Sequence, residues 1–183
     1  FPVVSGANRT VNQVYGGSEG PGGDIYSKGS LIAQSLRMLI GDDAFHRSLT
    51  RLVYGTDDPR PGAFTPLYRS TQDFLQIVNE VTGRDYGWFF RSYLYNAALP
   101  MLTHTRDGDV LKLEWTTGDG GVFPMPLEVE IDGRVQTVAM TGGRGQIAVP
   151  AGAHVLIDPQ NKVLRQMDVI DELQAYKAAQ KPK

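Results

Sequence analysis

The sequence predicts an α+β protein in which a helical half precedes a half built from antiparallel strands. Apolar residues recur three and four positions apart between residues 31 and 94, which is typical of amphipathic helices. From Met101 onward they alternate with polar residues, as half-buried strands do. Asp107-Gly108 and Asp132-Gly133 are hairpin turn signals in this second half.

We therefore expect three regions. Residues 1–100 should be mainly helical, residues 101–167 should form an antiparallel β-sandwich, and residues 168–183 should form a short C-terminal helix and tail. The stretch at 16–24, GGSEGPGGD, is rich in glycine and is expected to be a loop before the first helix.

Capping signals delimit the first two expected helices. Asp24 can accept the free amides of the first helical turn, and Gly41 suits a helix stop that requires a left-handed residue. Asp42 is expected to cap a second helix, which runs to about Tyr54 with Phe45 on its apolar side.

Two further helices and a series of strands follow. Ser70 or Thr71 should begin the third helix and Gly83 should end it, and Asp85 should cap a fourth helix that closes before Pro100. The expected strands are the alternating runs VLKLEW, PLEVEID, VQTVAM and QIAVP, and the run VLID near the end.

Composition excludes several classes of function. The 183 residues carry a net charge of −2, so no broad basic field is available for nucleic acid. Cysteine is absent, which excludes disulfides, thiolate metal sites and cysteine nucleophiles. No apolar run approaches the roughly 18 residues that a membrane span requires. The cellular compartment stays open.

The helix opening at Tyr26-Ser27-Lys28-Gly29 is the main candidate for chemistry. A phosphate-binding P-loop needs glycine directly before lysine, and here the order is reversed. The Tyr/Lys pair of short-chain dehydrogenases is four residues apart on one helical face, whereas Tyr26 and Lys28 are two apart. On its own, Tyr26 could simply pack its ring and leave its hydroxyl in solvent.

The three histidines form no recognisable ligand set. His46, His104 and His154 lie far apart in the sequence, and none belongs to a His-Glu-x-x-His motif. Their roles stay open.

The order and spacing of several short elements resemble the zinc aminopeptidases of the aminopeptidase N and leukotriene-A-hydrolase type, which are gluzincins. That family has a Tyr-x-Lys-Gly element that opens a helix, then Leu-Arg, then Gly-Asp-x-x-Phe. The matching residues here, with the later ones, are Tyr26, Lys28, Gly29, Leu36, Arg37, Gly41, Asp42, Phe45, Thr71, Asp73, Phe74, Gly83, Asp85, Phe89, Phe90 and Pro100. The resemblance covers about residues 20–165.

The resemblance implies a catalytic role for Tyr26, whose hydroxyl would donate a hydrogen bond to the oxyanion of a peptide substrate. Lys28 is expected to be structural, and Gly29 to permit close packing against a neighbouring helix. The family's zinc ligands and general base precede the Tyr-x-Lys-Gly element, and they are missing here. The chain is therefore expected to be the C-terminal part of a larger zinc peptidase, to depend on an upstream zinc-binding region, and to be inactive alone.

Two alternatives remain open. One is a related gluzincin of different specificity, such as a glycyl aminopeptidase, which also has a Tyr-x-Lys-Gly element. The other is a helical and β-sandwich binding module without catalysis.

Overall fold

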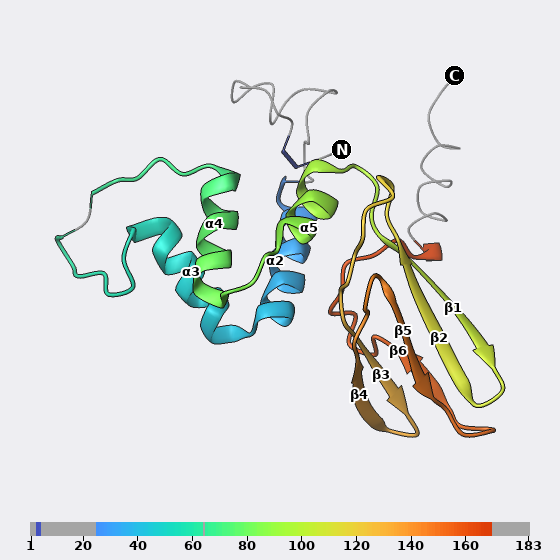
Figure 1. Cartoon of the computed structure of the whole chain (residues 1–183). Coiled ribbons are helices and arrows are strands. Elements are labelled where there is room, and N and C mark those ends of the chain that lie inside the picture. Colours follow the sequence, from blue (N-terminus) through green and yellow to red (C-terminus); the bar gives the residue numbers. More distant parts are fainter. Residues whose placement is uncertain (1–2, 5–24, 64, 170–183) are drawn as a thin grey trace, which may run out of the picture. The chain divides into compact units, whose positions relative to one another are not determined.

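The computed structural model describes residues 3–4, 25–63 and 65–169. The chain divides into two compact units, Phe1–Ala97 and Ala98–Lys183. The described part of the first unit is helical and that of the second unit is built from antiparallel strands (Figure 1). The predicted α+β class is confirmed.

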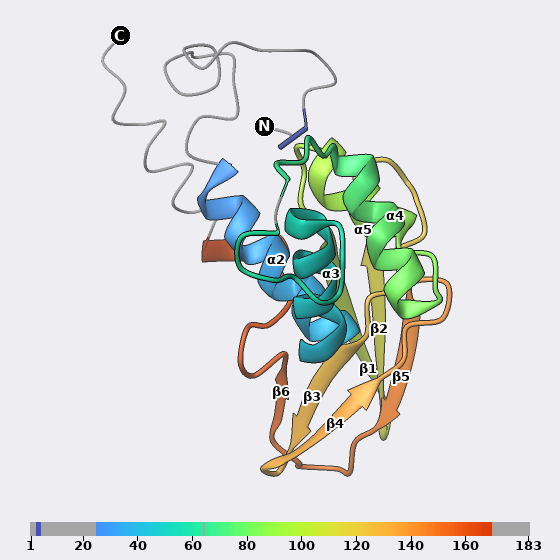
Figure 2. The same cartoon turned by 90° about the vertical axis from the view of Figure 1, so that its left-hand side faces the viewer.

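The first unit contains the helices α2 (Ser27–Ile40), α3 (Asp42–Tyr54) and α4 (Thr71–Thr82). A short α-helix, α5 (Gly87–Phe90), runs directly into a π-helical turn, η2 (Arg91–Tyr95). Helices α3 and α4 lie side by side in Figures 1 and 2.

Two of the predicted helix boundaries are confirmed in detail. Gly41 adopts a φ of 83°, and its amide donates to the carbonyl of Arg37 at the end of α2. The Ser70 hydroxyl accepts the Asp73 amide at 3.2 Å, and an Asp73 carboxylate oxygen accepts the Ser70 amide at 2.6 Å. This reciprocal pair is a capping box, which satisfies amides that the first turn of α4 leaves unpaired.

The prediction that Asp42 caps the second helix is wrong. Gly41 alone joins α2 to α3 and holds the cap position, so Asp42 is already the first helical residue. The Asp42 carboxylate accepts two hydrogen bonds of 2.7 Å from the Arg37 guanidinium instead. The hydrogen bond from Arg37 keeps the pKa of Asp42 below its ordinary value.

Asp85 does not hold the cap position of the fourth helix as predicted, but lies one residue before it. Tyr86 holds that position at the start of α5, while the Asp85 carboxylate accepts the Gly87 amide at 2.8 Å. The prediction that Asp24 caps the first helix falls on residues outside those described. In the structure Tyr26 holds the cap position of α2, without a side-chain capping bond.

Aromatic side chains form the core of the helical unit. Phe89, Phe90 and Tyr93 are at most 2% exposed. The rings of Phe89 and Tyr93 meet edge to face with centroids 4.7 Å apart, and Phe90 contacts Phe74 of α4 in the same way at 5.4 Å. This core holds α5 and η2 against α4.

The second unit contains two three-stranded antiparallel sheets. Their strand orders are β1-β2-β5 and β4-β3-β6. The strands are β1 (Met101–Asp107), β2 (Val110–Thr116), β3 (Leu127–Ile131), β4 (Arg134–Val138), β5 (Arg144–Ala148) and β6 (Val155–Ile157). In Figure 2 the sheet of β4, β3 and β6 lies in front of the sheet of β1, β2 and β5.

Alternate residues of the two central strands form the core of this unit. Leu113 and Trp115 of β2 and Leu127 and Val129 of β3 are all at most 6% exposed. The Trp115 indole donates to the carbonyl of Met125 at 2.8 Å, which satisfies a buried polar group with a buried partner.

The segment after β6 is held by a buried carboxylate. Asp158 is 2% exposed, and its carboxylate accepts the Lys162 and Val163 amides and pairs with Arg165. The expected C-terminal helix lies almost wholly outside the described residues, which end at Val169. No helix within the described ranges is both long and apolar enough to cross a membrane.

Candidate functional site

The candidate site lies at the start of α2. Tyr26 is 63% exposed, and its carbonyl accepts the Ser30 amide at 2.9 Å. The Ser30 hydroxyl also donates to the Ser27 carbonyl at 3.0 Å. The backbone of Tyr26 is therefore fixed by the first turn of the helix, while its ring is accessible to solvent.

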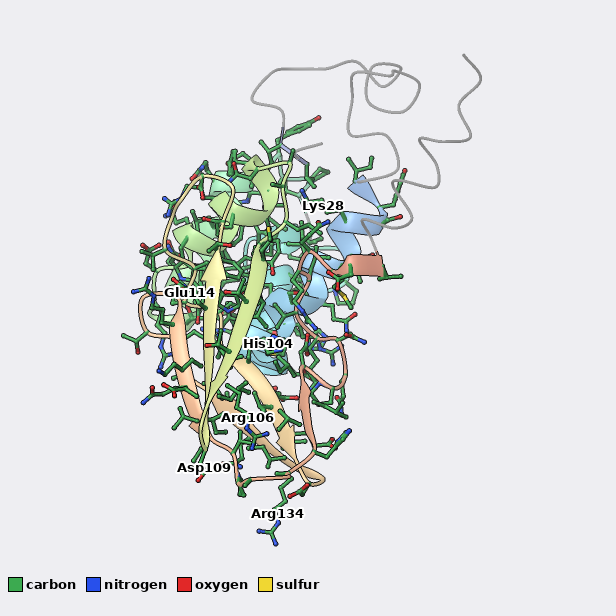
Figure 3. The ribbon with its side chains drawn as sticks, turned by 90° about the vertical axis from the view of Figure 1, so that its right-hand side faces the viewer. Lys28, His104, Arg106, Asp109, Glu114 and Arg134 are labelled. Atoms are coloured by element: carbon green, nitrogen blue, oxygen red, sulfur yellow. The ribbon has the colours of Figure 1, made fainter. Side chains whose placement is uncertain are left out.

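Lys28 ties this turn to the far end of the helical unit. Figure 3 labels Lys28 at the start of α2. Its ammonium group donates to the carbonyls of Asn96 at 2.9 Å and Ala97 at 3.4 Å. Asn96 directly follows η2, and its side-chain amide donates to the Arg91 carbonyl at 3.2 Å. Lys28 therefore donates to carbonyls that follow a helical end, where positive charge is favourable.

An apolar pocket of about 370 Å³ opens beside the same turn. Gly29, Ile32 and Leu36 of α2 line one side of it. The residues on its other sides include Phe74 of α4, Phe90 of α5 and Leu94 of η2.

The close packing expected at Gly29 is not found among the described residues. A Cβ atom at this position would meet no other heavy atom within 4 Å. Gly29 therefore faces open space in this part of the chain.

Most other residues of the aminopeptidase-like pattern have an architectural role. Gly41 and Gly83 end helices in positive-φ conformations, Asp73 belongs to the capping box, and Phe89 and Phe90 are core residues. Among the aromatic residues of the pattern, Tyr26 differs because most of its side chain is exposed. The pattern therefore combines a scaffold with one exposed phenol.

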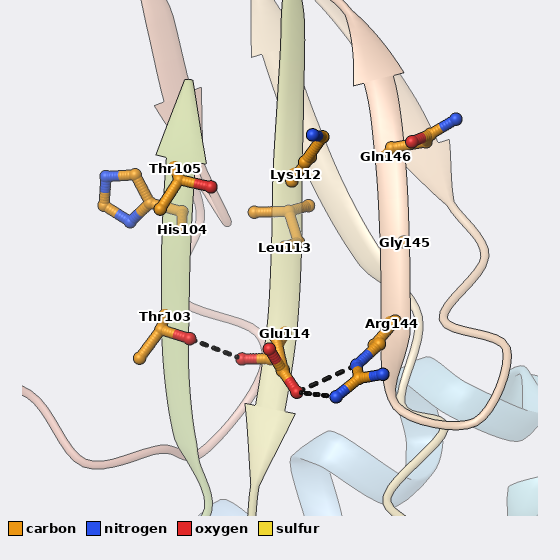
Figure 4. A pocket seen from close by; sticks show the side chains of 9 residues that line it. All are labelled: Thr103, His104, Thr105, Lys112, Leu113, Glu114, Arg144, Gly145 and Gln146. Atoms are coloured by element: carbon orange, nitrogen blue, oxygen red, sulfur yellow. Dashed lines mark hydrogen bonds and ion pairs between the residues drawn. The ribbon is translucent and has the colours of Figure 1, made fainter. Parts of the chain in front are cut away.

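A second pocket, of about 390 Å³, lies on the sheet of β1, β2 and β5 (Figure 4). Its charged side chains are largely paired. Glu114 accepts two hydrogen bonds from Arg144, at 2.8 and 2.6 Å, and Lys112 donates to Asp107 at 2.6 Å. The hydrogen bond from Lys112 lowers the pKa of Asp107. This surface is a solvated sheet face, on which the charges largely satisfy one another.

The described residues include no group of three histidine, cysteine, aspartate or glutamate side chains that could hold a metal ion. His46 lies on α3, where its ring meets that of Phe45 at 5.9 Å between centroids. His104 lies on β1 and lines the sheet pocket, and His154 precedes β6, where its amide donates to Asp132 at 2.9 Å.

Sequence reasoning did not find the partners of Lys28. They are backbone carbonyls 68 and 69 residues away, and a carbonyl has no side-chain signature in a sequence. It also missed the pocket beside Gly29, which residues from five separate helical elements line together.

Comparison with known proteins gives a fold likeness. No family model and no curated protein matches the sequence. A crystal structure of Legionella pneumophila aminopeptidase A in complex with aspartic acid is similar, with a TM-score of 0.54 and 15% sequence identity. The match covers 79% of this chain and 18% of the Legionella chain, so this chain matches about a fifth of that protein's length.

Proposed function

We propose that this chain forms part of an aminopeptidase-like zinc metallopeptidase and supplies its transition-state-stabilising tyrosine, Tyr26. The observation that carries the proposal is an exposed phenol on a fixed first helical turn, within a fold like that of an aminopeptidase. The order of the Tyr-x-Lys-Gly element and the later motifs supports it.

The described residues do not fit a zinc site by themselves, because they include no suitable cluster of ligands. We assign no zinc ligand within them. The proposal places the ligands and the general base in a region that precedes Tyr26 in a larger protein. In zinc peptidases the metal polarises the scissile carbonyl and activates water.

The chemistry proposed for Tyr26 is hydrogen-bond donation. As the peptide carbonyl becomes tetrahedral, negative charge develops on its oxygen, and a preorganised phenol donates to that oxygen more strongly than to the ground-state carbonyl. A single donor of this kind contributes on the order of 10²–10³ to the rate.

The apolar pocket beside Gly29 is the proposed contact for the zinc-binding region. Its lining comes from α2, α3, α4, α5 and η2 and from the two residues before α4, and Gly29 leaves space for another chain segment to approach α2 closely. An apolar surface of this kind is expected where two parts of a catalytic domain meet. Its position one turn from Tyr26 would bring the phenol towards the metal-binding region.

The test is Tyr26→Phe in the larger protein. We expect turnover of an aminoacyl substrate to fall at least tenfold, with the zinc content unchanged, because the change removes only the hydroxyl. Tyr68→Phe is the matched control, since Tyr68 is fully exposed on the loop before α4 and lies outside the proposed site. Near-normal turnover of Tyr26→Phe would contradict the assigned role.

A further inference from the structure

We propose that Lys28 is a positioning residue for Tyr26, and that it acts by clamping the first turn of α2 to the segment that follows η2. This inference rests on the proposed function of Tyr26. The two residues lie on one helical turn, but only Tyr26 would touch the substrate.

The clamp joins the start of α2, the first described helix, to the end of the helical unit. Lys28 is the second residue of α2, and its ammonium group reaches the carbonyls of Asn96 and Ala97, the last two residues of the unit. A π-helical turn such as η2 is rare in proteins and is frequent at functional sites. One side chain therefore connects the start of the candidate catalytic helix to the exit from an unusual turn.

Within the described residues, the start of α2 lacks the two usual supports of a helix N-terminus. The cap position carries no side-chain capping bond, and the first turn has no acidic residue to interact with the helix dipole. The capping box of α4 supplies such support locally. At α2 the two hydrogen bonds from Lys28 provide a tertiary anchor for the turn.

This anchor controls where the phenol lies. The Tyr26 carbonyl accepts the Ser30 amide, so the backbone of Tyr26 moves with the turn that Lys28 holds. A displacement of about 1 Å in a catalytic group can reduce a rate on the order of 10²-fold. Loss of the anchor should therefore reduce turnover through Tyr26, with little effect on substrate binding.

Amide hydrogen exchange, measured on this chain alone, tests the clamp without an assay of enzymatic activity. In Lys28→Met, which removes the ammonium and keeps an apolar stem, we expect the Ser30 amide to exchange at least ten times faster. The Gly41 amide, which donates at the opposite end of α2, serves as the internal control and should change less than twofold. Unchanged protection at Ser30 would overturn the clamp.

A double-mutant cycle in the larger protein tests the route through Tyr26. We expect Lys28→Met to lower kcat about tenfold with KM within twofold when Tyr26 is present. In the Tyr26→Phe background the same change should lower kcat less than twofold. Lys28→Arg, which keeps donors for both carbonyls, should restore at least half of kcat.

The outcomes separate this inference from the proposed function. Impaired Tyr26→Phe with normal Lys28→Met would overturn the positioning role alone. If Lys28→Met lowers kcat equally in the presence of Tyr26 and in the Tyr26→Phe background, Lys28 has only a structural role. That result would also overturn the positioning role. Normal turnover of Tyr26→Phe would refute the proposed function, and the positioning role with it. If Lys28→Met does not fold, Lys28→Gln is judged by the same criteria.

Discussion

Replacing Gly29 by alanine should have opposite effects on this chain alone and on the larger protein proposed above. In the described residues a Cβ atom at Gly29 meets nothing within 4 Å, and the residue is inside α2. Alanine is favoured over glycine within a helix by about 0.5–1 kcal/mol, so the chain alone should become slightly more stable.

In the larger protein the same methyl group would occupy space assigned to the zinc-binding region. Adding a methylene-sized group to a packed interface costs about 1–3 kcal/mol. The net change there should therefore be destabilising, despite the gain in helix propensity. A reversal in sign between the two contexts would support packing of the zinc-binding region at this pocket.

The assay is urea unfolding followed by circular dichroism at the helical band, because the described helices belong mainly to the first unit. Gly41→Ala is the matched control at the other end of α2. Its φ of 83° and ψ of 162° are accessible essentially to glycine alone, so it should lose about 1–3 kcal/mol in both contexts. Stabilisation by Gly29→Ala in both proteins would refute the proposed contact.

Two further predictions concern the scaffold. Gly145→Ala should cost about 1–3 kcal/mol in urea unfolding, because its Cβ atom would lie 2.7 Å from the Ala139 carbonyl oxygen; an unchanged midpoint would contradict this packing. Hydrogen bonds from Arg51 and then Arg47 hold the pKa of Asp57 well below its ordinary value of 3.8. A depressed carboxylate pKa stabilises the fold above the unfolded pKa, and this stability is lost as the pH falls through the folded value. The free energy of unfolding should therefore fall more steeply from about pH 4 to about pH 2 in the parent than in Asp57→Asn. Equal pH dependence in the two proteins would count against the stabilising interaction of Asp57 with the two arginines.

The sequence predicted those parts of the fold that depend on local interactions. Ser70 and Asp73 are three residues apart and satisfy each other's amides, so the start of α4 follows from spacing alone. Gly41 and Gly83 end helices because each adopts a positive φ that other residues avoid. Asp132-Gly133 turns the chain between β3 and β4, as its composition indicates.

Features set by tertiary contacts did not follow from the sequence. Strand β1 has no run of buried apolar residues, and its pairing with β2 from Met101↔Thr116 to Asp107↔Val110 determines its structure. Aspartate is a residue type typical of helix caps, but Gly41 alone links α2 to α3 and holds the cap position, so Asp42 cannot act as the cap. The change from α-helical to π-helical hydrogen bonding at Arg91 has no signal in the residue types.

The same distinction applies to the candidate site. The residue types and spacing of Tyr26, Lys28 and Gly29 were sufficient to single out the helix opening, because few structural needs place a phenol, an ammonium and a glycine there together. What each does depends on partners that spacing does not reveal. Lys28 finds backbone carbonyls at Asn96 and Ala97, and Gly29 faces open space in the described part of the chain. The structure thus places three neighbouring residues in different surroundings, and each of the roles proposed for them can be tested by its own substitution.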